Sequence, residues 1–480
     1  MKVIVTGAPV IGHLNPLFAA GRILAGLGHE VVGYAPSVFR SNVEANGMAF
    51  HALPPDADVD TRDLGKFMSF PLEEPPGDFT LLRIYWERLF VGHMREEYLG
   101  LRDLLRQFPA DIILAENMSY ATLPMLLGPR SRRPVIAHFG AVFLQLTRDD
   151  QAPMFSGLPP ARTEDDRITY GKLAEEARQI WFDPVDALLS AMLAELGCPP
   201  LPLPFYDAMI KLPDLYLQTG VPGFELPRTA LPSTLHYVGA TQPAAGVDAI
   251  PDWAADLEDG RKVVLVTQGT AANSDLGQLI RPTLEALADE RDLVVVATTG
   301  GRPVEILGTV PDNARIAQFL PYHWLMPKLD LLVTNGGYGS VNHALSLGIP
   351  LVVAGTTEDK KEVSARVTWS GVGLALGTDD PTVKQIGRPS AKCSVQRPSG
   401  IGRRYSRRNI KPTLLRTNWA LSSKPLFRMS GPRRRKTLSL TVSALRLPGD
   451  WGRQATTATC GYVSLAGWNR CPKPEPSVPL

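Results

Sequence analysis

The segment 331–360 constrains the fold most, because its thirty residues alternate the elements of an α/β protein within one short stretch. They read LLVTNGGYGSVNHALSLGIPLVVAGTTEDK. An apolar run, a glycine loop, an apolar-periodic segment, a second apolar run and an acidic loop follow one another, which predicts strand, loop, helix, strand and loop. We expect the helix to begin at Ser340 and to end at Gly348, ahead of Pro350.

The glycines of this stretch predict a ligand site. Gly336, Gly337 and Gly339, after Asn335, allow a tight turn in which the backbone approaches a ligand closely. A helix that begins at such a loop directs unpaired N–H groups and its positive dipole end at the ligand, often a phosphate. An ordinary βα turn would carry the same glycines. The acidic loop at 358–359, one strand later at the same edge, favours the ligand site.

Residues 1–386 alternate strand-like and helix-like segments, which is typical of βαβ units and parallel sheets. Prolines and glycines between residues 219 and 259 predict an irregular connection between two halves. We therefore expect an α/β fold of two doubly wound Rossmann-like domains facing a central cleft. The predicted divisions are an N-terminal domain 1–240, a linker 241–260, a C-terminal domain 261–386 and a tail 387–480. The expected strands are 3–6, 30–34, 112–115, 134–138, 215–218, 263–267, 293–298, 331–334 and 351–354, and the expected helices include 14–27, 276–287 and 341–347.

The tail differs from the rest of the chain in charge. Residues 387–480 hold 14 Arg and 5 Lys against two acids, a net charge of +17, whereas residues 1–386 hold 31 basic and 46 acidic residues, a net charge of −15. Acids almost vanish after Ile386, and Arg, Pro, Ser, Cys and Trp rise together. We interpret this irregular basic tail as an out-of-frame reading that begins near codon 386. The alternative is a genuine extension whose arginine runs at 403–408 and 431–436 bind nucleic acid or another anionic surface.

Two titratable residues follow expected strands of the first half. His13 stands in TGAPVIGHLNP, which we place in a loop between the first strand and the first helix. An exposed histidine there can take a proton near neutral pH. Glu116 follows the strand 112–115 and would emerge at the same edge, where its carboxylate could orient the imidazole. The alternative for Glu116 is a helix N-terminal acid that complements the dipole.

These segments together resemble a known family. GHLNP at 12–16, VTQGT at 266–270, the stretch 319–353 and TEDK at 357–360 resemble the catalytic and donor-binding motifs of nucleotide-sugar-dependent glycosyltransferases with the GT-B fold. The resemblance is to the UDP-glycosyltransferase superfamily, and within it to bacterial macrolide-glycosyltransferase-type members. It covers about residues 1–386.

The resemblance implies an inverting transfer without a metal or other cofactor, with a UDP- or dTDP-sugar as co-substrate. His13 would remove the proton of the acceptor hydroxyl, and Glu116 would support His13. The helix that begins after Gly337 would meet the diphosphate charge. The implied donor-binding residues are Gly269, Thr270, Pro321, Tyr322, Asn335, Gly336, Gly337, Gly339, Ser340, His343, Glu358, Asp359 and Lys360.

Four positions depart from the family pattern. Asn335 replaces the usual histidine before the paired glycines, and His343 replaces the glutamate that grips the ribose hydroxyls. Lys360 replaces the glutamine that reads a hexose with the preceding Asp359. Glu116 is one methylene longer than the usual aspartate. These departures leave the identity of the donor sugar open.

The resemblance implies a hexosyltransferase that moves a sugar to a hydroxyl of an apolar small molecule, such as a flavonoid, a macrolide or another polyketide. We expect it to be cytoplasmic, with no membrane partner and no nucleic-acid partner. The alternatives are a sugar-nucleotide epimerase of the same fold, and a catalytically impaired nucleotide-sugar-binding protein with a nucleic-acid-binding tail. An aromatic-rich segment could line the acceptor pocket or simply pack in the core; it comprises Phe67, Met68, Phe70, Phe79, Tyr85, Trp86 and Phe90.

Overall fold

A computed structural model describes residues 1–62, 77–241, 249–270 and 273–387, and two short strands beyond them. The chain divides into two compact units, Met1–Leu421 and Ser422–Leu480. In the second unit, β14 (Phe427–Met429) pairs antiparallel with β15 (Leu438–Leu440). The arginine runs of the tail lie outside the described residues, as do Phe67, Met68 and Phe70 of the aromatic segment.

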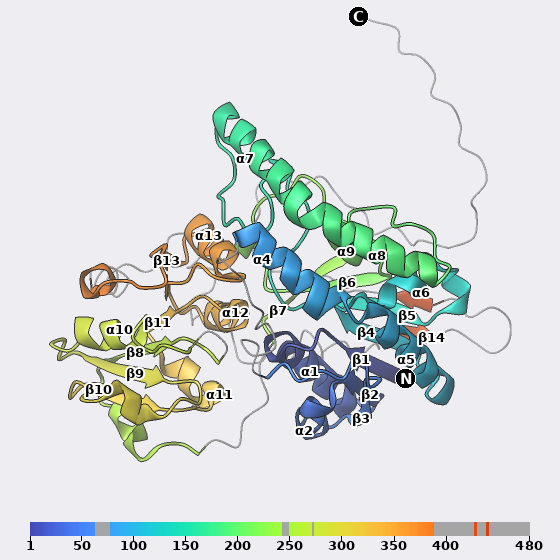
Figure 1. The fold of residues 1–480 in the computed structure, drawn as a ribbon. Coiled ribbons are helices and arrows are strands. Elements are labelled where there is room, and N and C mark those ends of the chain that lie inside the picture. The colour runs from blue at the N-terminus through green and yellow to red at the C-terminus, as the bar shows by residue number, and fades with distance from the viewer. Residues whose placement is uncertain (63–76, 242–248, 271–272, 388–426, 430–437, 441–480) are drawn as a thin grey trace, which may run out of the picture. The chain divides into compact units, whose positions relative to one another are not determined.

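A seven-stranded sheet organises the first half of the chain (Figure 1). Its strand order is β3-β2-β1-β4-β5-β6-β7, and all neighbouring strands pair in parallel. The central strands are continuous apolar runs because helices cover both faces of such a sheet; Ile4 and Ile113, for example, are completely buried. The strands are β1 (Lys2–Thr6), β2 (Glu30–Ala35), β3 (Ala49–Ala52), β4 (Ile112–Glu116), β5 (Val135–Gly140), β6 (Leu215–Thr219) and β7 (Leu235–Gly239).

The helical segments of this half connect and cover the strands. The α7, η5 and α8 segments follow one another without a break, and the middle one has π-helical turns (Figure 1). The segments are α1 (Ile11–Gly26), η1 (Ser37–Phe39), α2 (Arg40–Ala45), α4 (Asp78–Tyr85), η2 (Trp86–Val91), α5 (Met94–Gln107), η3 (Tyr120–Thr122), α6 (Leu123–Leu127), η4 (Arg130–Arg132), α7 (Glu164–Ala177), η5 (Arg178–Phe182), α8 (Asp183–Glu195), α9 (Phe205–Lys211) and η6 (Pro222–Phe224).

A parallel six-stranded sheet organises the second half, in the order β10-β9-β8-β11-β12-β13. Its strands are β8 (Lys262–Thr267), β9 (Leu293–Thr298), β10 (Ala314–Ala317), β11 (Leu331–Thr334), β12 (Leu351–Val353) and β13 (Gly373–Ala375). Its helical segments are η7 (Asp252–Leu257), α10 (Ile280–Ala286), η8 (Val304–Leu307), α11 (Tyr322–Leu325), η9 (Met326–Lys328), α12 (Tyr338–Ser346) and α13 (Lys360–Ser370).

Two parallel sheets with covering helices confirm the predicted fold class. The order in which the chain adds strands changes side between β1 and β4 in the first sheet, and between β8 and β11 in the second. Ligands of doubly wound proteins bind beyond the carboxyl ends of the strands at such switch points. Both switch points coincide with the segments that the sequence singles out.

Several predicted boundaries are wrong. The helix predicted from residue 14 begins at Ile11, because the N–H groups of His13 and Leu14 already bond to the Val10 carbonyl. His13 therefore lies in the first turn of a helix and not in a loop. The helix predicted to begin at residue 276 begins at Ile280. The connection predicted between 219 and 259 contains β7, whose half-buried residues lack a continuous apolar run.

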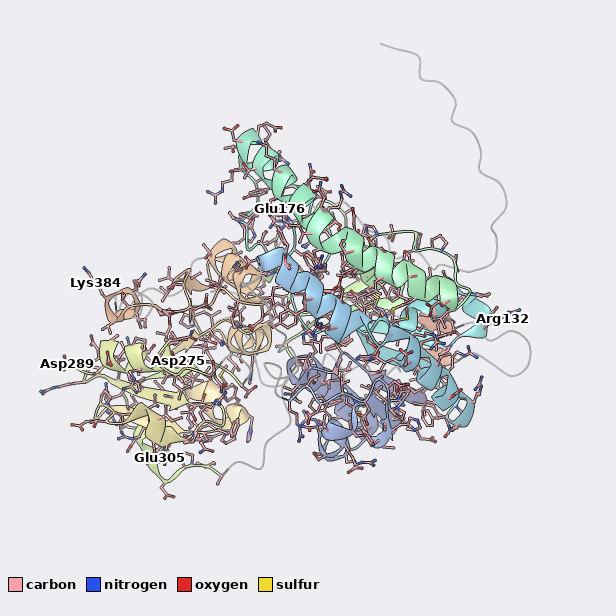
Figure 2. All side chains as sticks on the ribbon, viewed as in Figure 1. Arg132, Glu176, Asp275, Asp289, Glu305 and Lys384 are labelled. Carbon is pink, nitrogen blue, oxygen red and sulfur yellow. The ribbon has the colours of Figure 1, made fainter. Side chains whose placement is uncertain are left out.

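Many charged side chains lie on the surface. Figure 2 labels Arg132, Asp289 and Glu305 among the charged residues that project from the ribbon, and all three are exposed. No helix among the described residues is long and apolar enough to cross a bilayer. The described part of the first unit ends in a helical turn at 383–387, in which Ile386 is completely buried.

Candidate active site

His13 and Glu116 meet at the switch point of the first sheet. His13 lies in the first turn of α1, which follows β1, and Glu116 is the last residue of the neighbouring strand β4. His13 Nδ1 and Glu116 Oε1 are 3.0 Å apart. The Glu116 side chain is completely buried, whereas that of His13 is 15% exposed. The carboxylate is therefore fixed, and the imidazole keeps an accessible edge.

The second carboxylate oxygen of Glu116 is also bonded. Oε2 accepts a hydrogen bond from the Met118 backbone N–H at 3.0 Å. With that oxygen occupied, Oε1 faces His13, and a carboxylate can only accept. Nδ1 therefore carries the proton, and Nε2 is left as the basic nitrogen. This end-of-strand position excludes the alternative of Glu116 as a helix N-terminal acid, because the next helical segment, η3, begins only at Tyr120.

The surroundings of His13 favour its protonated form. Burial lowers the pKa of His13, but the charge and hydrogen bond of Glu116 and the charge of Asp359 raise it by more, so that its pKa lies above the ordinary value. Asp359 belongs to the second half of the chain, at the N-terminal end of α13. The charge of a carboxylate from the second half thus adds to that of Glu116 in raising the pKa of His13.

The loops after β8 and β11 flank the second switch point. Gly269 has a φ of +69° and Gly336 a φ of +96°, conformations that favour glycine. The Asn335 amide donates to the Gln268 carbonyl at 2.6 Å, which ties the two loops together. Thr270, next to Gly269, is exposed. The predicted glycine loop is therefore one of two loops, at 268–270 and 335–337, that are joined by this hydrogen bond and together form a glycine cradle.

The helix after this cradle begins earlier than predicted. Gly337 is its N-cap and Tyr338 its first residue, so Ser340 lies within the first turn, beside Gly339, and does not open the helix. The helix ends at Ser346, not at Gly348. The N-cap is a glycine, Gly337, so no side chain caps this helix, although glycine is itself a common N-cap residue. The free N–H groups of the first turn face the end at which the cradle lies.

His343 lies further along the same helix. Its side chain is nearly buried, and burial lowers the pKa of His343 to about 4. The imidazole is therefore neutral at neutral pH. It offers one donor and one acceptor, where a glutamate would offer only acceptors.

Pro321 and Tyr322 follow β10 at the same edge of the sheet. Pro321 is the N-cap of the short helix α11, and its carbonyl accepts from the N–H groups of Trp324 and Leu325. Tyr322 is half-buried. The Pro321 carbonyl is thus already occupied by the helix, and the backbone around Tyr322 remains for a ligand.

The acidic loop follows β12. Glu358 is exposed and has a φ of +47°, uncommon for a residue with a side chain. The ammonium of Lys360 pairs with Glu358, and burial lowers the pKa of Lys360 to about 8. Asp359 makes no side-chain capping bond to its helix. Burial raises the pKa of Asp359 to about 6, while His13 and Arg366 lower it.

The aromatic segment divides between core and pocket. Trp86 is 2% exposed and packs on Trp181 in the core. Phe90 lies beside the imidazole of His13, with ring centroids 5.9 Å apart. Phe79 lines a pocket of about 330 Å³, together with Phe155. Figure 2 labels Glu176 on α7, which lines the same pocket.

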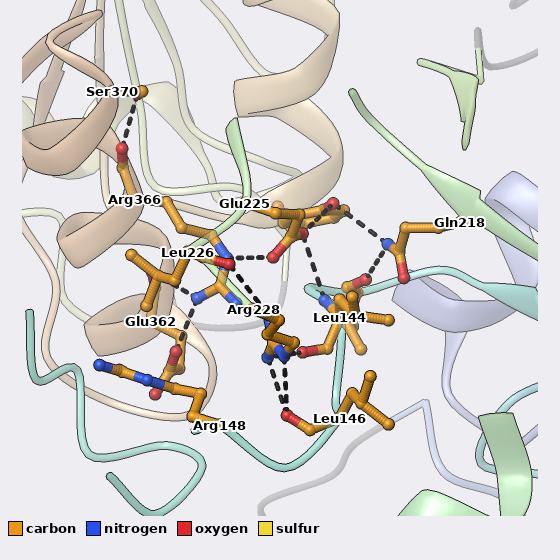
Figure 3. Close-up of polar contacts among 12 residues, drawn as sticks. Leu144, Leu146, Arg148, Gln218, Glu225, Leu226, Arg228, Glu362, Arg366 and Ser370 are labelled. Atoms are coloured by element: carbon orange, nitrogen blue, oxygen red, sulfur yellow. Dashed lines mark hydrogen bonds and ion pairs between the residues drawn. The ribbon is translucent and has the colours of Figure 1, made fainter. Parts of the chain in front are cut away.

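A buried polar cluster was missed by the sequence prediction. Figure 3 shows Gln218 and Glu225 of the first half beside Arg366 and Glu362 of α13. Arg366 Nε donates to Glu225 Oε2 at 2.8 Å, and its Nη1 donates to Glu362 Oε2 at 2.6 Å. Glu362 and Arg366 have the i, i+4 spacing of a helical ion pair, but no local spacing links them to Glu225, which is more than 100 residues away. The i, i+4 pair alone would indicate an ordinary helical ion pair on the surface.

No group of His, Cys, Asp and Glu among the described residues is arranged to hold a metal ion. The site residues are instead a histidine–carboxylate pair on one sheet, and glycine loops, a helix N-terminus and an aspartate on the other. Such a set can take a proton from a hydroxyl and stabilise an anionic group.

Several known proteins are similar to this chain in sequence. Residues 281–399 match the family model of the erythromycin biosynthesis protein CIII-like C-terminal domain. The chain is 36% identical over 376 residues to the 4'-demethylrebeccamycin synthase of Lentzea aerocolonigenes, across 78% of this chain and 87% of that protein. It is 32% identical over 402 residues to UDP-glycosyltransferase 2 of Phaeomoniella chlamydospora, across 80% and 86% of the two chains.

Solved structures share the fold. The calicheamicin glycosyltransferase CalG4 superposes with a TM-score of 0.61 at 17% identity, over 85% of this chain and 92% of that one. The spinosyn rhamnosyltransferase SpnG, complexed with thymidine diphosphate, superposes with a TM-score of 0.57 at 18% identity, over 84% and 94%.

Proposed function

The chain belongs to the UDP-glycosyltransferase superfamily, with the GT-B fold, and from this premise we propose that it transfers a sugar from a UDP- or dTDP-sugar to a hydroxyl of an apolar small molecule. That it is a glycosyltransferase of the natural-product type follows from its relatives. The donor, the acceptor class and the inverting course of the reaction are our proposal.

One observation carries the proposal: His13 Nδ1 lies 3.0 Å from Glu116 Oε1 at the switch point of the first sheet, while Asp359 of the second half acts on the same imidazole. This observation supports the proposal, in which His13 is the base on one sheet and Asp359 is the carboxylate of the other half that contacts the sugar. The transfer needs this juxtaposition, because the acceptor oxygen must reach the anomeric carbon.

The proposed step is a single displacement. The acceptor O–H gives its proton to His13 Nε2, and its oxygen forms a bond to the anomeric carbon. The bond from that carbon to the diphosphate oxygen breaks, and the nucleoside diphosphate leaves with the electron pair. Glu116 stabilises the imidazolium that forms and holds its tautomer. Attack opposite the leaving group inverts the anomeric configuration.

The second half would hold the donor. The first-turn N–H groups after Gly337, with the Ser340 hydroxyl and the Gly269–Thr270 loop, would meet the negative charge of the leaving diphosphate. The backbone near Tyr322 would hold the pyrimidine base, and His343 would contact the ribose. Asp359 would accept hydrogen bonds from sugar hydroxyls.

The names of relatives support both donor nucleotides. One relative is a UDP-glycosyltransferase, and one solved neighbour is a rhamnosyltransferase with thymidine diphosphate bound. On the acceptor side, the pocket lined by Phe79 and Phe155, and the ring of Phe90 beside His13, are suited to an apolar acceptor.

The test is a donor panel. Full-length protein is incubated with UDP-glucose or dTDP-rhamnose and a phenolic acceptor, and products are analysed by mass spectrometry. A hexose or deoxyhexose increment on the acceptor is expected. An acceptor left unchanged while the donor sugar isomerises would show an epimerase, and no change in either substrate with any donor would contradict the proposal.

A further inference from the structure

Glu225 lies where the two halves of the chain are tied together. It follows η6 and is 6% exposed. Oε1 accepts from the Leu144 N–H at 3.2 Å and lies 3.2 Å from the Tyr338 hydroxyl, and Oε2 accepts from Arg366 Nε at 2.8 Å. Both oxygens of this one carboxylate are therefore engaged (Figure 3).

Through its bond with the Tyr338 hydroxyl, Glu225 contacts α12, one of the two helices of the second half that would bind the donor. Tyr338 is its first residue, between Gly337 and Gly339 of the cradle. Its hydroxyl lies 2.8 Å from the Thr219 carbonyl and accepts from Gln218 Nε2 at 3.2 Å. The start of the helix that faces the cradle is thus held by residues at the end of β6, a strand of the other sheet.

The second connection reaches α13, whose N-cap is Asp359. Arg366 is completely buried; it donates to Glu225 and Glu362, and its guanidinium lies 4.7 Å from the centre of the Phe143 ring. Glu362 in turn accepts from the Gly157 N–H at 3.1 Å. The charge of Arg366 also lowers the pKa of Asp359, so the cluster reaches the sugar-reading carboxylate electrostatically.

One carboxylate thus holds both donor-side helices against the segment that follows β5. We infer that Glu225 is a positioning residue for glycosyl transfer: by holding Tyr338 and Arg366 it sets the donor-side helices in register with the His13–Glu116 pair. This inference rests on the proposed function. Glu225 does not touch the reacting atoms, and its effect passes through the two helices.

Loss of a positioning residue lowers the turnover and leaves nucleotide binding intact, whereas loss of a merely structural residue lowers both. The nucleotide would bind to the second half alone, so a misaligned variant still binds it. The acceptor hydroxyl and the anomeric carbon no longer meet correctly, and a displacement of about 1 Å lowers the rate about 100-fold. A merely structural defect would reduce the number of nucleotide-binding sites and the turnover together.

The test is Glu225→Gln in the full-length protein. The amide keeps the shape but turns an N–H toward either Arg366 or Leu144, both of which are donors. We expect kcat to fall about 100-fold, with the dissociation constant and stoichiometry for UDP and dTDP, measured by calorimetry, changing far less. The acid limb of the pH–rate profile should move less than in Glu116→Gln, because the His13–Glu116 bond is untouched and only the effect of the Asp359 charge on His13 changes. Tyr338→Phe, which removes only a hydroxyl, should lower kcat in the same way but less.

Asp214→Asn is the matched control. Asp214 also bonds an arginine, Arg133, through both oxygens, and accepts from the Ile136 N–H, but it lies before β6 at the opposite edge of the sheet. Its substitution should lower the melting temperature and leave kcat close to that of the wild type. Equal turnover of wild type and Glu225→Gln would overturn the positioning role, as would a loss of turnover matched by lost nucleotide-binding sites. A wild type without product would instead refute the proposed function.

Discussion

Replacing Glu116 by glutamine tests the catalytic pair through its tautomer. In the wild type, Oε1 faces His13 Nδ1 and Oε2 faces the Met118 N–H, each at 3.0 Å. A glutamine that keeps its oxygen toward Met118 presents its N–H to Nδ1. The proton of the imidazole then moves to Nε2, and the base is lost.

The magnitude follows from the two orientations of the amide. In the first orientation His13 has the wrong tautomer, and the loss of general base catalysis lowers the rate about 10²–10⁴-fold. In the opposite orientation the amide N–H faces the buried Met118 N–H, which then has no acceptor, and this costs about 1–3 kcal/mol. Neither orientation preserves the site, so we expect kcat to fall about 10²–10⁴-fold.

The assay is the pH dependence of the initial transfer rate. Glu116 helps to raise the pKa of His13, and only the neutral imidazole is active, so the wild-type rate rises with pH through that elevated pKa. In the Glu116→Gln variant the acid limb should move to lower pH while the maximal rate falls. Glu116→Asp, which retains the charge, should recover part of the rate. A Glu116→Gln enzyme with wild-type turnover and an unmoved acid limb would refute the reasoning.

Three further predictions follow from the second half and the tail. Asp359→Asn should lower kcat/KM for the donor about 10–100-fold, because a hydrogen bond to a charged group contributes about 1.5–3 kcal/mol, and should move the acid limb of the profile to lower pH. Burial lowers the pKa of Lys360 from 10.5 to about 8, so the free energy of unfolding of the wild type should rise between pH 8 and pH 10.5 relative to that of Lys360→Gln, by at most about 1.4 kcal/mol per pH unit. Denaturant titrations at several pH values measure this difference, and parallel curves of stability against pH would contradict it. Translating the coding DNA after codon 386 in the other two frames should reveal an amphipathic helical continuation; its absence in both frames would refute the frameshift hypothesis.

The sheets were predictable because their strands are buried on both faces. The runs that form β1, β8 and β11 are continuous and apolar, and the loops after them carry the glycines that a switch point needs. The sequence also predicted that His13 and Glu116 meet, because parallel strands end at one edge. Short or half-buried strands such as β7 and β13 have no comparable signal, and they were missed.

Helix starts and the ties between the halves were not predictable. Proline is most common in the first turn of a helix, which favours a helix start close to Pro16. In the structure α1 begins at Ile11, so Pro16 lies inside the helix, which tolerates the missing N–H. Tyr338 lies within the glycine motif, but nothing local indicates that its hydroxyl reaches Thr219. The pairing of Glu225 with Arg366 depends on how α13 packs, which no sequence period encodes.

The proposed transfer depends most on His13, the base that faces the donor-binding half. The most direct measurement is the initial transfer rate of His13→Ala beside the wild type, with nucleotide binding measured on the same samples. We expect product formation to fall about 10²–10⁴-fold while UDP or dTDP still binds. A His13→Ala enzyme that forms product as fast as the wild type would contradict the role of His13 as the base.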